Sequence, residues 1–190
     1  MDRFLHQKFV FGYGSLMWNP GFPFLERIPA TIHGFHRSLC MYSHMYRGTP
    51  EHPGLVLGLD RGGFCQGFAF MIADADWDEA IAYLRAREQV TNMYRELIKP
   101  VRLRGDGETR VNAVVYAVDR SHRQYAGRLS LEEQLLHVRQ GHGQSGSCSD
   151  YVLSTVQHLR EAGIRDRRLE QIAKALALGE GPHAAIETAS

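Results

Sequence analysis

Short apolar runs, separated by glycine, proline and aspartate, occupy the first two thirds of the chain. Phe9-Val10-Phe11 stops at Gly12, which predicts a strand followed by a glycine turn. Runs rich in β-branched and aromatic residues predict further strands at 32–42, 54–59, 63–72, 94–103 and 109–118. Asp60-Arg61-Gly62-Gly63 predicts a turn between two of them, and Gly105-Asp106-Gly107 predicts the turn of an antiparallel hairpin. Strands are therefore expected to dominate up to residue 118.

One helix is expected to interrupt these strands. Asp76 can cap its start, and Glu79, three residues later, completes a capping-box pattern. Ile81 and Leu84 then fall on one side of the helix, which is expected to end near residues 87–90.

The pattern changes to helices after residue 129. Ser130 with Glu133 predicts the start of a helix that stops at Gly141. Two more helices are predicted at 149–162, before Gly163, and at 166–178, before Gly179. These elements predict an α+β fold. The strands follow one another without a repeated strand–helix unit, one helix is inserted among them, and the C-terminal third is helical.

The composition is that of an ordinary folded protein of 190 residues, with 44% hydrophobic and 23% charged residues. This length predicts a single domain over residues 1–190, with a loose tail at 180–190. The formal charge is +1, from 22 Lys and Arg against 21 Asp and Glu, which leaves no overall field to attract nucleic acid. We expect neither nucleic-acid binding nor an obligatory protein partner.

Charged residues and cysteines predict the setting of the protein. Asp2, Arg3 and other charges interrupt the first thirty residues, so neither a signal peptide nor a membrane span is expected. Cys40, Cys65 and Cys148 are an odd number of cysteines at wide spacing. They predict a reduced, cytoplasmic setting.

Gly12-Tyr13-Gly14-Ser15-Leu16 follows the first predicted strand directly. Flexible glycines allow successive backbone N–H groups to turn toward one point, an arrangement that binds anions. A tight turn that needs glycine for its dihedral angles explains the same residues, and the glycines alone favour that interpretation. Met17 stands where a dinucleotide fingerprint has its third glycine, so a nucleotide site is not predicted.

Glu88 extends the apolar face of the inserted helix, because Trp77, Ile81, Leu84 and Glu88 are spaced by four, three and four residues. Burial of a carboxylate there would raise its pKa toward neutrality and allow it to accept and return a proton. A helix end that pairs with a basic residue elsewhere in the fold explains the same pattern. Periodicity alone leaves the two interpretations even.

Neither a metal nor a cofactor site is predicted. His33 with His36, and His142 with Cys148, are the nearest candidates, and neither pair has convincing ligand spacing. The Gly143–Tyr151 stretch, which is rich in glycine and polar residues, and residues 47–54 either contact a ligand or are plain connections.

Taken in order, four motifs resemble the ChaC-like γ-glutamylcyclotransferases. They are Phe11-Gly12-Tyr13-Gly14-Ser15-Leu16-Met17-Trp18, then Arg47-Gly48-Thr49-Pro50 with Pro53-Gly54, then Tyr83-Leu84 with Arg87-Glu88, and last the glycine-rich loop that ends in Asp150-Tyr151. The resemblance extends from about Phe9 to Tyr151. Each motif alone is weak, and their shared order makes the resemblance specific.

The resemblance implies a small mixed or antiparallel β-barrel flanked by helices, and cleavage of glutathione to 5-oxoproline and cysteinylglycine without metal or cofactor. It implies that Glu88 is the catalytic base and acid, that Tyr13, Gly14, Ser15 and Leu16 hold the γ-glutamyl group, and that Tyr151 lines the same pocket. Leu55 and the segment after Glu88 depart from many eukaryotic members. Other γ-glutamyl substrates, and a silent module that binds a small anion, therefore stay open as alternatives.

Overall fold

The computed structural model of the chain describes residue 4 and residues 6–88, 92–105 and 109–179. It divides into two compact units, one of Met1–Ser38 and Leu57–Tyr125, the other of Leu39–Val56 and Ala126–Ser190. The single domain over 1–190 stays a prediction, and the predicted loose tail at 180–190 lies outside the described residues. No helix in the described part of the chain has the length and apolar character needed to span a bilayer.

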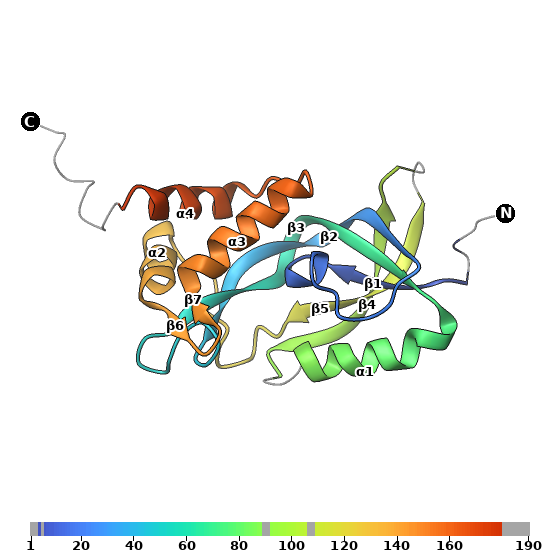
Figure 1. Cartoon of the computed structure of the whole chain (residues 1–190), viewed down its shortest axis with the longest axis horizontal. Coiled ribbons are helices and arrows are strands. Elements are labelled where there is room, and N and C mark those ends of the chain that lie inside the picture. Colours follow the sequence, from blue (N-terminus) through green and yellow to red (C-terminus); the bar gives the residue numbers. More distant parts are fainter. Residues whose placement is uncertain (1–3, 5, 89–91, 106–108, 180–190) are drawn as a thin grey trace, which may run out of the picture. The chain divides into compact units, whose positions relative to one another are not determined.

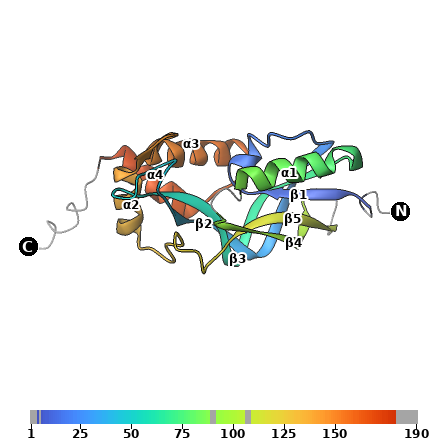
Figure 2. The same ribbon diagram turned by 90° about the horizontal axis from the view of Figure 1, so that it is seen from below.

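Five strands close a barrel in the order β1-β3-β2-β4-β5 (Figures 1 and 2). They are β1 (Lys8–Gly12), β2 (Glu26–Ser43), β3 (Gly54–Ile72), β4 (Tyr94–Leu103) and β5 (Arg110–Val118). β1 runs antiparallel to β3 and parallel to β5, while β4 is antiparallel to both β2 and β5. The expected mixed barrel within an α+β fold is therefore confirmed.

The predicted turn at Asp60-Arg61-Gly62-Gly63 is wrong, because β3 runs through it without a break. Gly62 and Gly63 have φ values of 105° and 66°, in the left-handed region that glycine enters at little cost. The two glycines therefore change the local direction of one long strand, where the sequence suggested two strands and a turn.

Successive residues of β1 face two different hydrophobic clusters. Phe9 and Phe11 pack with residues such as Val115 of β5 in the cluster on the inner side of the barrel. Val10 belongs to a second cluster, in which the helix α1 (Trp77–Glu88) packs beside β1 (Figure 2). A 3-10 turn, Asp74–Asp76, leads into α1, so the predicted cap Asp76 is itself part of a helical turn.

Three helices pack on one another in the described residues of the second unit: α2 (Leu131–Gln140), α3 (Cys148–Glu161) and α4 (Arg167–Ala177) (Figure 1). Ser130 and Glu133, which predicted the start of α2, form a complete capping box there. Ser147 caps α3, so this helix begins earlier than predicted. Two short strands, β6 (His142–Gly143) and β7 (Gly146–Ser147), pair with each other just before it. The helix predicted at 166–178 is α4, and Asp166 is its N-cap.

Candidate active site

The turn after β1 is held by its two apolar side chains. Tyr13 is 7% exposed and belongs to the inner cluster of the barrel, whereas Leu16 is 6% exposed and belongs to the cluster beneath α1. Gly12 is required for close packing, because a Cβ there would lie 3.0 Å from the ring of Phe70. The backbone between Tyr13 and Leu16 is therefore fixed from both ends.

The same turn has several backbone donors that find no acceptor in the described part of the chain. The 3-10 turn η1 (Ser15–Met17) uses the Met17 N–H, which donates to the Gly14 carbonyl oxygen at 2.9 Å. Among the described residues, the N–H groups of Gly14, Ser15 and Leu16 donate to no acceptor. These donors can serve an anion or a developing oxyanion.

Gly14 itself does not occupy the left-handed region. Its φ is −127° and its ψ is −134°, and a Cβ added there would meet only the side chain of Leu57, at 3.9 Å. A positive φ therefore does not explain this glycine, and its backbone lies in neither the helical nor the extended region. The backbone at Gly14 carries no side chain, and a Cβ there would have room.

Glu88 is the last residue of α1 and continues its buried face. Ile81 and Leu84 on that face are buried, and the Glu88 side chain is 18% exposed. Burial raises the pKa of Glu88, and the positive charge of Arg87 opposes part of this shift. The carboxyl group thus has the elevated pKa that the helical spacing suggested.

One guanidinium group joins this carboxylate to the glycine turn. Arg87 donates from Nη2 to the Ser15 hydroxyl at 2.8 Å, and its Nε lies 3.4 Å from Oε1 of Glu88. It also donates from Nη1 to the Asn19 carbonyl oxygen at 2.8 Å and to the Tyr83 hydroxyl at 3.2 Å. Ser15 and Glu88, which are 73 positions apart in sequence, therefore share one partner, a role of Arg87 that the motif did not reveal.

A second carboxylate, Glu96, is committed to a fixed set of partners. Arg85 donates to both of its oxygens, at 2.8 and 2.7 Å, and the Tyr116 hydroxyl donates to it at 3.0 Å. The Arg85 hydrogen bonds lower the pKa of Glu96. Burial, followed by the interaction with Glu96, raises the pKa of Tyr116, and the charge of Glu88 contributes less. Glu96 thus stays ionised and Tyr116 neutral, while Glu88 is the carboxyl group suited to proton exchange.

Tyr151 lies in the second unit, in the first turns of α3. The guanidinium of Arg47 lies over its ring, 5.2 Å from the centroid. Arg47 also donates to the carbonyl oxygens of Ser145 and, at 3.3 Å, Ser147. Within this unit, Arg47 therefore links the 47–54 segment to the glycine-rich loop that ends in Tyr151.

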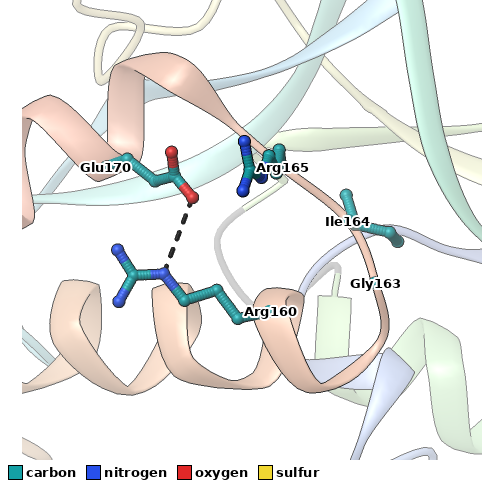
Figure 3. A pocket seen from close by; sticks show the side chains of 5 residues that line it. All are labelled: Arg160, Gly163, Ile164, Arg165 and Glu170. Atoms are coloured by element: carbon teal, nitrogen blue, oxygen red, sulfur yellow. Dashed lines mark ion pairs between the residues drawn. The ribbon is translucent and has the colours of Figure 1, made fainter.

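Two other features lie apart from the predicted residues. In the part of the chain that the structure describes, no group of three or more His, Cys, Asp or Glu side chains could hold a metal ion. A pocket of about 500 Å³ lies where α3 turns into α4, and an ion pair of Arg160 with Glu170 at 3.6 Å spans it (Figure 3). None of the predicted site residues lines this pocket.

Comparison with known proteins identifies the family. Residues 8–178 match the family described as ChaC-like protein. A glutathione-specific gamma-glutamylcyclotransferase of Escherichia coli (strain K12) is 32% identical over 163 residues, which cover 86% of this chain and 70% of that protein. The enzyme of the same name from Schizosaccharomyces pombe (strain 972 / ATCC 24843) is 31% identical over 170 residues, covering 80% of this chain and 82% of its own length.

A solved structure shows the same fold. The crystal structure of a gamma-glutamyl cyclotransferase specific to glutathione from yeast aligns with a TM-score of 0.81 at 24% identity, covering 94% of this chain and 99% of that one. The family match spans nearly the whole described sequence, from β1 to the end of α4. The chain therefore belongs to the ChaC-like family.

Proposed function

We propose that this chain cleaves glutathione by cyclising its γ-glutamyl group to 5-oxoproline and releasing cysteinylglycine. The names of the relatives support the substrate. The observation that carries the chemistry is the Arg87 guanidinium, which holds the Ser15 hydroxyl with one nitrogen and the Glu88 carboxylate with another.

The substrate supplies its own nucleophile in this reaction. Its α-amine attacks its γ-carbonyl carbon, a five-membered ring closes, and the bond to the cysteinylglycine nitrogen breaks. The protein needs no covalent intermediate. It must remove a proton from the ammonium group, stabilise the oxyanion and protonate the leaving amine.

Glu88 is assigned both proton transfers. Its carboxylate accepts the ammonium proton, and the resulting carboxylic acid returns a proton to the departing nitrogen. A pKa raised by burial suits both steps, because the ionised form is a stronger base and the protonated form is still acidic enough to donate. The N–H groups of Gly14, Ser15 and Leu16 are assigned to the substrate oxygens, including the oxyanion.

Tyr13 and Leu16 act in this proposal by fixing the turn from its two ends, since their side chains are buried in separate clusters. Tyr151 is assigned to the substrate pocket because its motif matches that of the family. No metal or cofactor takes part in this mechanism. We place the reaction in the cytoplasm because the three cysteines are odd in number and widely spaced, and we infer no nucleic-acid partner because the net charge is near zero.

Incubation of the purified chain with glutathione in the presence of a chelator, with 5-oxoproline as the readout, tests this function. We expect stoichiometric 5-oxoproline and cysteinylglycine. A panel of γ-glutamyl amino acids and γ-glutamylamines assayed in parallel determines selectivity. Turnover of the panel compounds without turnover of glutathione would contradict the proposal that glutathione is the substrate. Activity that is restored only by added zinc would contradict the metal-free mechanism.

A further inference from the structure

Arg37 of β2 contacts the glycine turn on its carbonyl side. Its Nε donates to the Tyr13 carbonyl oxygen at 2.6 Å, and its Nη2 donates to the Gln66 carbonyl oxygen of β3 at 2.7 Å. The guanidinium is thus tied to a neighbouring strand of the barrel while it binds the turn. The half-buried Arg37 is not among the residues that the motifs assign to the site.

This hydrogen bond determines where the next backbone donor points. The peptide bond between Tyr13 and Gly14 is trans, so its C=O and N–H groups point in opposite directions. Because Arg37 holds the carbonyl oxygen, the Gly14 N–H is directed away from Arg37. That N–H has no acceptor in the described part of the chain.

The same contact strengthens the donor. A positively charged group that donates to an amide oxygen polarises the amide, and hydrogen bonds in a chain reinforce one another. The Gly14 N–H then carries more positive charge than the amide of a turn without such a partner. The stabilisation that this N–H gives to an acceptor increases when negative charge develops on the acceptor, as it does in a tetrahedral transition state.

We infer that Arg37 is a positioning residue for catalysis, which aims and polarises the Gly14 N–H toward the oxyanion formed from the γ-glutamyl carbonyl. This role rests on the proposed function. Arg37 does not touch the substrate in this account, and it acts through the Tyr13–Gly14 peptide. Its Nη2 also lies 3.8 Å from the Met17 sulfur of the same turn.

Arg27 provides a matched control on the same strand and the same turn. It donates from Nη1 to the Met17 carbonyl oxygen at 3.1 Å. The peptide bond between Met17 and Trp18 carries the Trp18 N–H. This N–H already donates to the Ser15 carbonyl oxygen at 3.2 Å. Arg27 therefore anchors the turn without directing an unused donor.

The experiment compares Arg37→Gln, Arg37→Lys and Arg27→Gln in steady-state turnover of glutathione. Loss of an oxyanion donor typically lowers kcat ~10²–10³-fold, so we expect Arg37→Gln to lower kcat about 10²-fold with little change in KM. Arg37→Lys, which retains the charge and one donor, should recover part of that loss. Arg27→Gln should change kcat by less than about tenfold, well below the loss expected for a missing donor.

An NMR measurement without substrate separates this inference from the proposed function. The Gly14 amide proton should shift upfield in Arg37→Gln and less in Arg37→Lys, and it should stay in place in Arg27→Gln. If Arg37→Gln does not fold, Arg37→Lys carries both readouts. An unchanged Gly14 amide proton, or equal kcat losses in the two Gln variants, would overturn the role of Arg37. Absence of glutathione turnover by the wild-type chain would instead overturn the proposed function.

Discussion

The pKa of Glu88 is subject to two opposing effects from its surroundings. Burial raises it, and the Arg87 guanidinium, 3.4 Å from Oε1, lowers it. A general base is active in its ionised form, so kcat/KM should rise with pH through the pKa of Glu88. The charge at position 87 therefore determines how far that rise extends into the acid range.

Replacing Arg87 should separate its charge from its hydrogen bonds. In Arg87→Gln the opposing charge is lost, the pKa of Glu88 rises further, and the acid limb of the kcat/KM profile moves to higher pH. Arg87→Lys retains the charge, so its limb should stay close to that of the wild type while kcat falls, because one ammonium group cannot hold both Ser15 and Asn19. The pH dependence of kcat/KM measures both effects. An acid limb that stays in place, or moves to lower pH, in Arg87→Gln would contradict this account.

At the scale of elements, the loop after η1 is fitted closely against α1. Gly21 has a φ of 77°, and a Cβ at this position would clash with the Tyr83 hydroxyl of α1. Gly34 has a similar φ of 82°, but a Cβ there would meet nothing within 4 Å. The two glycines thus share a backbone conformation and differ in their surroundings.

This difference makes Gly34→Ala a control for Gly21→Ala. A left-handed backbone costs an alanine roughly 1–2 kcal/mol, which is the loss in free energy of unfolding that we expect for Gly34→Ala. Gly21→Ala should lose more, and it should also lose turnover, because the displaced loop carries the Asn19 carbonyl that holds Arg87. Urea unfolding and glutathione turnover test the pair. Equal losses of stability, with turnover preserved in both variants, would show that the loop does not support the site.

Local signals were predictable from the sequence, and contacts distant in sequence were not. The helix start predicted from Ser130 and Glu133 is confirmed, and both bonds of its capping box form within four residues. The turn at Gly62-Gly63 was predicted wrongly, because the same glycines serve a change of direction inside a long barrel strand. The contact of Arg37 with Tyr13 joins residues 24 positions apart, and no local sequence pattern predicts it.

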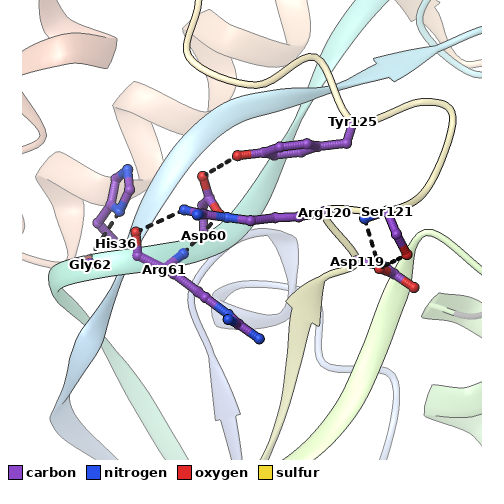
Figure 4. A network of polar contacts seen from close by, with 8 residues as sticks. All are labelled: His36, Asp60, Arg61, Gly62, Asp119, Arg120, Ser121 and Tyr125. Carbon is purple, nitrogen blue, oxygen red and sulfur yellow. Dashed lines mark hydrogen bonds and ion pairs between the residues drawn. The ribbon is translucent and has the colours of Figure 1, made fainter.

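At the scale of the whole molecule, the chain passes between its two compact units at residues 38/39, 56/57 and 125/126. Within the first unit, Asp60 follows shortly after the passage at 56/57. Its side chain binds Tyr125, the last residue before the passage at 125/126. Its side chain is 8% exposed and accepts hydrogen bonds from Arg120 at 2.6 Å and from the Tyr125 hydroxyl at 2.9 Å (Figure 4). Burial raises the pKa of Asp60, and these hydrogen bonds outweigh it, so the pKa is lowered.

Asp60→Ala should destabilise the protein by roughly 1–3 kcal/mol, because Arg120 and Tyr125 lose an acceptor in a largely buried position. Since the pKa of Asp60 is lowered in the folded state, its contribution should be present above the ordinary pKa of aspartate and disappear as pH falls through the folded value. Asp119→Ala removes the ion pair with the exposed Arg95 and two hydrogen bonds from the exposed Ser121, and it should cost less because water can replace these partners. Urea unfolding at neutral and acid pH measures both variants. Equal losses at neutral pH would contradict the role given to Asp60.

The residues of the proposed site differ in how far the sequence could identify them. Tyr13–Leu16 and Glu88 follow from motifs and helical spacing, and the structure brings Ser15 and Glu88 together through Arg87. Arg37 and Arg87 take their roles from tertiary contacts, because each guanidinium binds groups from two or more distant segments. Arg87 belongs to a quoted motif and Arg37 does not, and for neither does the sequence indicate which groups the guanidinium binds.

Turnover of glutathione by Glu88→Gln measures whether the Glu88 carboxylate transfers the protons. Glu79→Gln, an exposed glutamate on the same helix, is the control. General acid–base groups usually contribute ~10²–10⁴-fold, so 5-oxoproline formation by Glu88→Gln should fall at least 10²-fold while calorimetry still detects glutathione binding. Glu79→Gln should retain wild-type turnover. A folded Glu88→Gln protein that keeps more than about a tenth of wild-type turnover, far short of the expected loss, would contradict the account.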